Sequence, residues 1–199
     1  KMQLDNYFWS FEKAIPSNVC DNILKQGKLQ KENLATVDGT DISNAEDVDK
    51  LKVKRNSKVV WLNDTWIYRE LHNWLNLANR SANWNFQWDS SESCQFTKYS
   101  GDEKHHYDWH TDASSKLNQQ GLTRKLSMSL ALVDGDEYEG GDFEVSVLTP
   151  EKNNIHKVKA LNKKGSITVF PSFVWHRVTP VTSGTRYSLV SWHLGNPHI

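Results

Sequence analysis

The feature that most constrains the fold is a change of sequence pattern near Asn85. Before it, apolar residues recur at helical spacing. After it, short apolar stretches typical of strands follow one another almost to the C-terminus, separated by turn residues such as Gly140-Gly141 and Ser183-Gly184. Helices followed by a run of strands is the order of an α+β fold. We therefore expect N-terminal helices that support a β-sandwich or barrel.

Local patterns predict the individual elements. A helix should run from Ser17, as N-cap, to near Gly27, and a second from about 66 to 82 after Asn63 or Asp64. The polar segment 31–50 is interpreted as one long loop, and the basic run 52–58 as a solvated face. Strands are expected at 4–14, 59–62, 93–99, 105–112, 124–133, 141–148, 155–160, 165–171 and 185–193.

Composition narrows the class of protein. The chain has 199 residues, and its 24 Lys and Arg balance 24 Asp and Glu, which argues against nucleic acid or a membrane as partner. Residues 1–10 lack the apolar core of a signal peptide. The only cysteines, Cys20 and Cys94, have no metal-binding spacing, which favours a reducing cytoplasmic setting, although one disulfide between them is the alternative.

Three residues have the chemistry of a metal site. His110 and Asp112 lie two positions apart, so on an extended strand both side chains point to the same face. His176 adds a second imidazole far downstream. Two imidazoles and one carboxylate form the facial triad that holds a non-haem Fe(II) and leaves other positions open. The H-x-D pair alone is common by chance, and its alternative interpretation is a surface His beside a turn Asp.

Arg186 adds a candidate anion site. It lies ten residues after His176 in the strand-like stretch TRYSLVSW, where no acidic residue is near in sequence. A guanidinium buried in a sheet is costly unless its charge is paired. A bound dicarboxylate would provide that partner through a bidentate contact. The alternative is a structural salt bridge with a distant Asp or Glu.

These residues fall within sequence motifs that follow one another in a set order. They are Tyr99-Ser100-Gly101 with YDWH at 107–110, EGGDF at 139–143, GSITVFPSFVWHRV at 165–178, and GTRYSLVSW at 184–192. Over residues 92–193 the chain resembles the Fe(II)/2-oxoglutarate-dependent dioxygenase superfamily, specifically the prolyl 4-hydroxylase-like branch of compact bacterial and viral members.

The resemblance implies a fold and a set of site residues. The fold would be a double-stranded β-helix, a cupin-like jelly roll, in a single domain 1–199 with a support region 1–91 and a catalytic core 92–193. His110, Asp112 and His176 would bind iron, and Arg186 would bind 2-oxoglutarate. Tyr99 and Ser129 would line the co-substrate pocket, and Trp192 would pack beneath the site. The aromatic residues expected around the substrate are Tyr107, Trp109, Phe173 and Trp175.

Other segments receive weaker predictions. The loops 29–50 and 113–123 are expected to act as lids. His105 and His106 are expected at the solvent-facing rim, and His193 and His198 in structural roles. Asp108 shares the strand parity of His110 but lies outside the H-x-D pattern, so it ranks below Asp112 as a ligand.

The resemblance also implies the reaction. Fe(II), 2-oxoglutarate and O2 would hydroxylate an unactivated C–H bond, with ascorbate as an optional reductant, and the presence of Asp112 favours hydroxylation over halogenation. The preferred substrate is a proline in a peptide or protein, with a free amino acid or other small molecule as alternative. Two other classes remain open: a metal-dependent cupin-type hydrolase or isomerase without 2-oxoglutarate, and a non-catalytic binding module. Succinate production distinguishes the hydroxylase from both.

Overall fold

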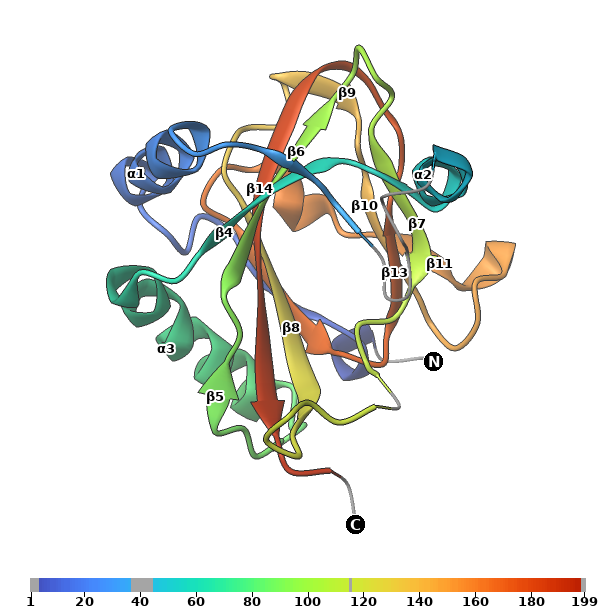
Figure 1. The fold of residues 1–199 in the computed structure, drawn as a ribbon. Helices are drawn as coiled ribbons and strands as arrows, with labels where there is room; N and C mark the ends of the chain where they lie inside the picture. The colour runs from blue at the N-terminus through green and yellow to red at the C-terminus, as the bar shows by residue number, and fades with distance from the viewer. Residues whose placement is uncertain (1–3, 37–44, 115, 198–199) are drawn as a thin grey trace.

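The computed structural model describes residues 4–36, 45–114 and 116–197. Two antiparallel sheets form the jelly roll, and helices cover the outer face of the larger one (Figure 1). The predicted fold class, a double-stranded β-helix with supporting N-terminal helices, is confirmed. No helix in these described ranges is long and apolar enough to span a membrane.

The larger sheet has the strand order β1-β12-β8-β14-β6-β4-β2, and β5 and β9 also pair with β14. The long strand β14 lies at its centre between β8 and β6. The strands are β1 (Trp9–Phe11), β2 (Asn33–Leu34), β4 (Lys58–Leu62), β5 (Ser90–Ser91), β6 (Cys94–Ser100), β8 (Thr123–Ala131), β9 (Tyr138–Gly140), β12 (Ile167–Pro171) and β14 (Val181–Gly195).

The smaller sheet has the order β11-β10-β13-β7-β3 and faces the larger one. Its central strands β13 and β7 pair directly and carry both histidines of the predicted metal site. The strands are β3 (Arg55–Asn56), β7 (His106–His110), β10 (Phe143–Ser146), β11 (Ile155–Lys157) and β13 (Trp175–Val178).

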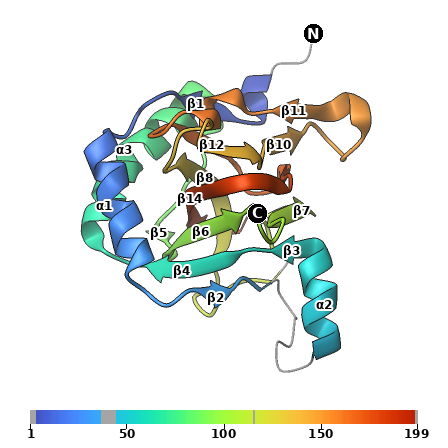
Figure 2. The same cartoon turned by 90° about the horizontal axis from the view of Figure 1, so that it is seen from above.

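Two long helices lie on the outer face of the larger sheet, and a third lies beside β3 and β7 at the edge of the smaller one (Figure 2). The long helix α3 buries one stripe at helical spacing, as its sequence predicts. The helices are α1 (Ser17–Lys28), α2 (Ala45–Lys54) and α3 (Thr65–Ser81), with short 3-10 helices η1 (Leu4–Asn6), η2 (Lys152–Asn154) and η3 (Lys159–Asn162).

Strand β8 shows how one strand serves both layers. Leu126, Met128 and Leu130 are fully buried in the core beneath α1 and α3. The alternate residues, Ser127 and Ser129 among them, point to the opposite face, toward the smaller sheet. Small side chains on this face leave room between the two sheets, and the candidate site occupies that room.

Several local predictions were wrong. Helix α1 begins at Ser17 with Pro16 in the N-cap position, and the Pro16 carbonyl accepts hydrogen bonds from the backbone N–H of Val19 and Cys20. Segment 31–50 is not one loop, because it contains β2 and most of α2, whose Leu51 is buried. Segment 4–14 contains η1 and only a short strand β1.

The strand β13, which carries His176, was missed because the turn after Pro171 separates it from β12 by only three residues. The two thiols are buried and free, so Cys20 and Cys94 do not form a disulfide in this structure.

Candidate metal centre and co-substrate pocket

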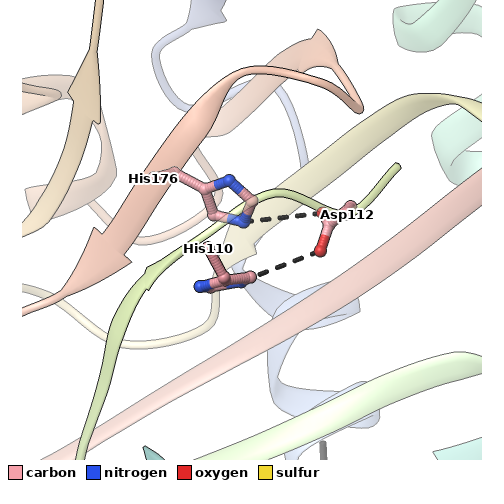
Figure 3. A group of neighbouring side chains, drawn as sticks. All are labelled: His110, Asp112 and His176. Carbon is pink, nitrogen blue, oxygen red and sulfur yellow. Dashed lines mark ion pairs between the residues drawn. The ribbon is translucent and has the colours of Figure 1, made fainter. Parts of the chain in front are cut away.

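Two paired strands and one turn position the predicted triad. His110 ends β7 and lies directly opposite His176 of β13 in the antiparallel register. Asp112 follows β7 by two residues, where its backbone N–H donates to the Ser172 carbonyl. Figure 3 shows the three side chains converging from these elements. The strand pairing therefore brings together residues that are far apart in the sequence.

The geometry of the triad suits a single ion. Asp112 Oδ1 lies 3.7 Å from His110 Nε2, and Asp112 Oδ2 lies 3.5 Å from His176 Nε2. The donor atoms of the three residues all lie within 4.8 Å of one another. All three side chains are largely buried, with total exposures of 9 % or less. This spacing allows one first-row metal ion to contact all three donors.

The hydrogen bonds of the two imidazoles orient their free nitrogens toward the carboxylate. His110 Nδ1 lies 2.7 Å from the Asp108 carbonyl oxygen, and His176 Nδ1 lies 2.9 Å from that of Val174. Each Nδ1 thus donates its proton to a backbone carbonyl, as in the outer contacts of metal-bound histidines. Each Nε2 then presents a lone pair to Asp112, because a neutral imidazole carries only one N–H.

Electrostatics favour a cation between these groups. Burial, together with the neighbouring His176, lowers the pKa of His110 to about 3, so its imidazole is neutral. Burial alone would raise the pKa of Asp112, but the two imidazoles, Arg124 and a hydrogen bond from Ser127 lower it below its ordinary value. Within the described residues, Asp112 Oδ2 is buried and has no hydrogen-bond partner. Lone pairs facing a carboxylate need a positive ion to offset their repulsion, so the donor set fits Fe(II).

The triad opens into a cavity of about 860 Å³ between the two sheets. The cavity is lined by both aliphatic and aromatic side chains and by several charged groups. Nine of the predicted site residues line it: Tyr99, Tyr107, Trp109, His110, Asp112, Ser129, Trp175, His176 and Arg186.

Arg186 has the surroundings of an anion-binding residue. Its side chain is 3 % exposed, and its Nη1 donates to Ser188 Oγ at 3.3 Å. Its guanidinium lies 5.3 Å from the centre of the Tyr99 ring. Among the described residues no carboxylate forms an ion pair with it. Gly141 leaves space for the Arg186 side chain, because a Cβ at this position would lie only 3.0 Å from Arg186 Cδ. The φ of +63° at Gly141 also favours glycine.

Tyr107 packs against the triad. Its ring stacks on the His110 imidazole with centroids 3.5 Å apart and an angle of 14° between the planes. Burial raises the pKa of Tyr107 to about 12, so its hydroxyl stays protonated. Burial likewise raises the pKa of Tyr99. Both phenols are therefore available in the cavity as neutral hydrogen-bond donors.

Two predictions about the surroundings were wrong. Phe173 is 56 % exposed and packs against Phe86 instead of lining the cavity, because it lies in the turn between β12 and β13. His105 is fully buried instead of lying at the rim, and its Nδ1 accepts a hydrogen bond from the Ser100 backbone N–H. That contact braces the turn between β6 and β7.

The other weak predictions have mixed outcomes. Trp192 lines the cavity. His193 is buried and forms hydrogen bonds with Ser91 and Ser191, so its position is structural. His198 lies outside the described residues, as does part of the segment 29–50. Residues on both sides of Ser115 in the segment 113–123 line the cavity, and the lid role of both segments stays a prediction.

The sequence interpretation missed Arg55, Trp61 and Arg124, which also line the cavity. Arg55 lies in the basic run that was interpreted as a solvated face, yet it is only 5 % exposed. A signal was present: Arg55 comes four residues before the apolar stretch Val59-Val60-Trp61-Leu62, so it lies close to a buried strand.

Comparison with known families decides the class of this site. The model of the 2OG-Fe(II) oxygenase superfamily matches residues 94–194, half of the chain. The chain belongs to the 2OG-Fe(II) oxygenase superfamily. Members of this superfamily use Fe(II), 2-oxoglutarate and O2, which agrees with the donor set and the buried arginine in the cavity.

Curated relatives of this 2OG-Fe(II) oxygenase are PKHD-type hydroxylases. One from Azoarcus sp. is 39% identical over 93 residues, which cover 46% of this chain and 38% of the relative. Another from Crocosphaera subtropica is 36% identical over 100 residues, which cover 50% of this chain and 41% of the relative. The chain thus spans about two fifths of the length of these relatives.

Solved structures of 2OG-Fe(II) oxygenases share the fold over nearly the whole chain. A prolyl-4-hydroxylase from Pseudomonas putida superposes with a TM-score of 0.68 at 18% identity, covering 98% of this chain and 96% of that one. A viral collagen prolyl hydroxylase from Paramecium Bursaria Chlorella virus-1 gives 0.65 at 16% identity, covering 95% and 96%. At these identities the likeness establishes the fold.

Proposed function

We propose that this protein is an Fe(II)- and 2-oxoglutarate-dependent dioxygenase that hydroxylates an unactivated C–H bond. One observation carries the proposal: a buried triad of two imidazoles and a carboxylate shares a cavity with the buried Arg186, which forms no ion pair within the described part of the chain. The triad accounts for the metal, and the guanidinium accounts for an anionic co-substrate. A cupin-type hydrolase would not require Arg186.

Each residue has a defined task in this proposal. His110, Asp112 and His176 would hold Fe(II) through two imidazole nitrogens and a carboxylate. When bound, Fe(II) and 2-oxoglutarate would supply the hydroxylation chemistry with O2 as the oxidant: one oxygen atom goes to the substrate C–H bond and the other to succinate, which forms with carbon dioxide from 2-oxoglutarate. Arg186 would bind the distal carboxylate of 2-oxoglutarate through charge-assisted hydrogen bonds. Tyr99 and Ser129 line the co-substrate pocket and orient that acid by hydrogen bonds.

The aromatic residues of the cavity shape the substrate site. Tyr107 restrains the His110 ring by stacking on it, and Trp109 and Trp175 form part of the cavity wall. Flat apolar walls exclude water and accept a proline ring or an extended peptide. We therefore propose prolyl hydroxylation of a peptide or protein, which the names of the structural neighbours support, with a free amino acid or small molecule as the alternative.

Three further proposals complete this assignment. Ascorbate would serve as reductant during uncoupled turnover. The cytoplasm is the compartment, because two buried free thiols suit reducing conditions. The chain forms a single domain, residues 1–199, in which the support region 1–91 contributes strands to both sheets of the core 92–193.

The decisive experiment is anaerobic. Addition of Fe(II) and 2-oxoglutarate should produce the visible charge-transfer band of a chelated 2-oxo acid. The band should be lost in His176→Ala. In Arg186→Ala it should need roughly 10–100 times more 2-oxoglutarate, since a charge-assisted pair is removed. Air should then yield succinate. Bound iron without a band would refute the proposal and favour the hydrolase alternative.

A further inference from the structure

The cavity contains a second buried guanidinium, which the proposed function does not use. Arg55 begins β3, lines the same cavity as the triad, and is 5 % exposed. Its Nη1 donates to the Thr36 carbonyl at 3.0 Å, while its buried Nη2 has no partner among the described residues. Within the same residues no carboxylate forms an ion pair with it. A permanently charged group so placed needs an anion.

Arg55 and Arg186 have the same local arrangement on opposite sheets. Each donates to a serine two residues ahead, Arg55 Nε to Ser57 Oγ at 3.4 Å and Arg186 Nη1 to Ser188 Oγ at 3.3 Å. Each guanidinium also lies over a tyrosine ring, at 4.3 Å for Arg55 over Tyr107 and 5.3 Å for Arg186 over Tyr99. In both cases the serine and the tyrosine orient the guanidinium group without neutralising its charge. The cavity thus holds two similarly arranged guanidinium groups, and the proposed function assigns a carboxylate to only one of them, Arg186.

The charges around the cavity support a second anion. Among the residues that the structure describes, five cationic side chains line it, and two anionic ones, Glu92 and Asp112, oppose them. The charges of Fe(II) and of the dianion 2-oxoglutarate cancel, so binding both leaves the excess of positive charge around the cavity unchanged. Arg124 and Glu92 form a bidentate ion pair at 2.8 and 2.6 Å and offset each other. The cations are Lys54, Arg55, Lys116, Arg124 and Arg186.

The position of Arg55 points to the substrate and not to the co-substrate. Its guanidinium lies over one face of Tyr107, and that ring stacks on His110. One aromatic ring therefore separates Arg55 from the proposed iron ligand. A group bound at Arg55 would lie beside the reacting centre, on the β3 side of the cavity. Arg186 enters from β14 of the other sheet, so one small dicarboxylate need not satisfy both.

We propose that Arg55 binds a carboxylate of the substrate that is hydroxylated, so that the enzyme selects an anionic substrate. This inference rests on the proposed function, because it assumes that 2-oxoglutarate occupies Arg186. The carboxylate belongs either to the terminal acid of an amino acid or peptide, or to an acidic side chain beside the target residue. Both sources present the same planar group, which a guanidinium fork binds with two parallel hydrogen bonds.

The test measures binding without turnover. The protein is saturated with Zn(II) and 2-oxoglutarate and titrated calorimetrically with acid–amide pairs. N-acetylproline against N-acetylprolinamide tests a terminal carboxylate. N-acetylglutamylprolinamide against N-acetylglutaminylprolinamide tests a side-chain carboxylate. We expect the acid of one pair to bind roughly 10–100 times more tightly than its neutral partner, the value of a charge-assisted pair. The pair that shows the preference identifies the source.

Two variants separate the arginines. Arg55→Gln should abolish the preference for the acid while the anaerobic Fe(II)–2-oxoglutarate band keeps its affinity, which also shows that the fold is intact. Arg55→Lys should restore part of the preference. Arg186→Gln, saturated with 2-oxoglutarate, should keep the preference although its band needs far more co-substrate.

Several outcomes would overturn the proposal. They are equal binding of acid and amide in both pairs, binding of no probe at all, or an acid preference that survives in Arg55→Gln. Loss of the co-substrate band in Arg55→Gln would instead assign that residue to 2-oxoglutarate and overturn it as well. Absence of the band in the unmodified protein would refute the proposed function, while the acid preference would still be measured with Zn(II).

Discussion

Two pairs of neighbouring histidines lie among the described residues, one fully buried and one with a buried and a half-buried member, and their difference shows what makes a metal site. His110 and His176 lie between the sheets, with ring centroids 4.1 Å apart. His72 of α3 and His193 of β14 lie on the helix side of the larger sheet, 5.6 Å apart. Burial lowers the pKa of His193 to about 3, the same value as for His110, and lowers that of His72. Burial and pKa therefore do not distinguish His193 from His110.

The partners of the free ring nitrogens do distinguish them. His193 contacts Ser91 Oγ at 2.9 Å through Nδ1 and Ser191 Oγ at 3.0 Å through Nε2, and Ser91 also contacts His72 at 3.1 Å. A hydroxyl can donate or accept, so both nitrogens of the His193 ring are satisfied. Asp112 can only accept, so the lone pairs of the first pair face another acceptor. Histidines with hydroxyl partners form a closed structural cluster, and histidines with a carboxylate need a cation.

The largest effect is expected from Asp112→Asn. The amide can donate to an imidazole nitrogen, so the fold should remain, but the charge that binds the metal is lost. Iron affinity should fall by more than the roughly 10–100-fold typical of outer-contact changes. Competition with a chelator measures it. Asp108→Asn is the matched control, because the Asp108 side chain is exposed and its carboxylate accepts from the Trp109 N–H, while the backbone carbonyl that contacts His110 is unchanged by the substitution. Equal losses in both variants would contradict the comparison.

His193→Ala should have the opposite effect: it should lower the stability of the fold and leave metal binding unchanged. It leaves a cavity and two serine hydroxyls without their ring partner, at a cost of about 3 kcal/mol in the free energy of unfolding. Urea titration measures this cost. The iron–2-oxoglutarate band should keep its intensity and affinity in the folded variant. A lost band with unchanged stability would mean that the second pair serves the site.

Acid should weaken the fold through the second pair. The pKa of His193 is lower in the folded state than its unfolded value of 6.5, so the unfolded chain binds more protons in this range. The contribution of His193 to the free energy of unfolding is complete above pH 6.5. It declines by a few kcal/mol as the pH falls toward 3. Unfolding of the parent and of His193→Gln should therefore be compared at pH 7 and pH 5. The parent should lose more stability, and parallel losses would refute this assignment.

Ser91→Ala should give the smallest effect. The hydroxyl bridges His72 and His193, so its loss should cost about 1 kcal/mol. Iron affinity should be unchanged. Thermal unfolding without Zn(II) measures the stability of the variant. Unfolding with Zn(II) measures its metal binding, because the increase in stability caused by the metal should equal that of the parent. A smaller metal-induced shift would link the two clusters.

Much of this arrangement could be predicted from local patterns. The alternation in β8 predicts that its small side chains share one face of the sheet. The same period of two predicts that His110 and Asp112 point to one side. The approach of His176 follows from the family motif and not from local physics. Its strand, β13, is only four residues long and lies next to a turn, so periodicity is too brief to detect it.

The apolar stretch after Arg55 signals that it lies near a buried strand, but its place in the cavity could not be predicted, for a different reason. Its neighbours Lys52 and Lys54 are exposed, and a run of basic residues usually indicates a solvated face. Only the pairing of the two-residue strand β3 with β7 turns Arg55 toward Tyr107. Long-range pairing of so short a strand leaves no periodic signal, so charge composition alone leads to the wrong interpretation.

The facing positions of His110 and His176 also have a consequence for folding. The two residues are paired across β7 and β13 although 65 residues separate them in the chain. A slip of one residue would turn one imidazole to the other face of the sheet. Such contacts between distant segments form late, after a costly loop closure. Iron uptake during refolding would therefore report when the jelly roll has closed in its correct alignment, while helix signals would report only that the chain has collapsed.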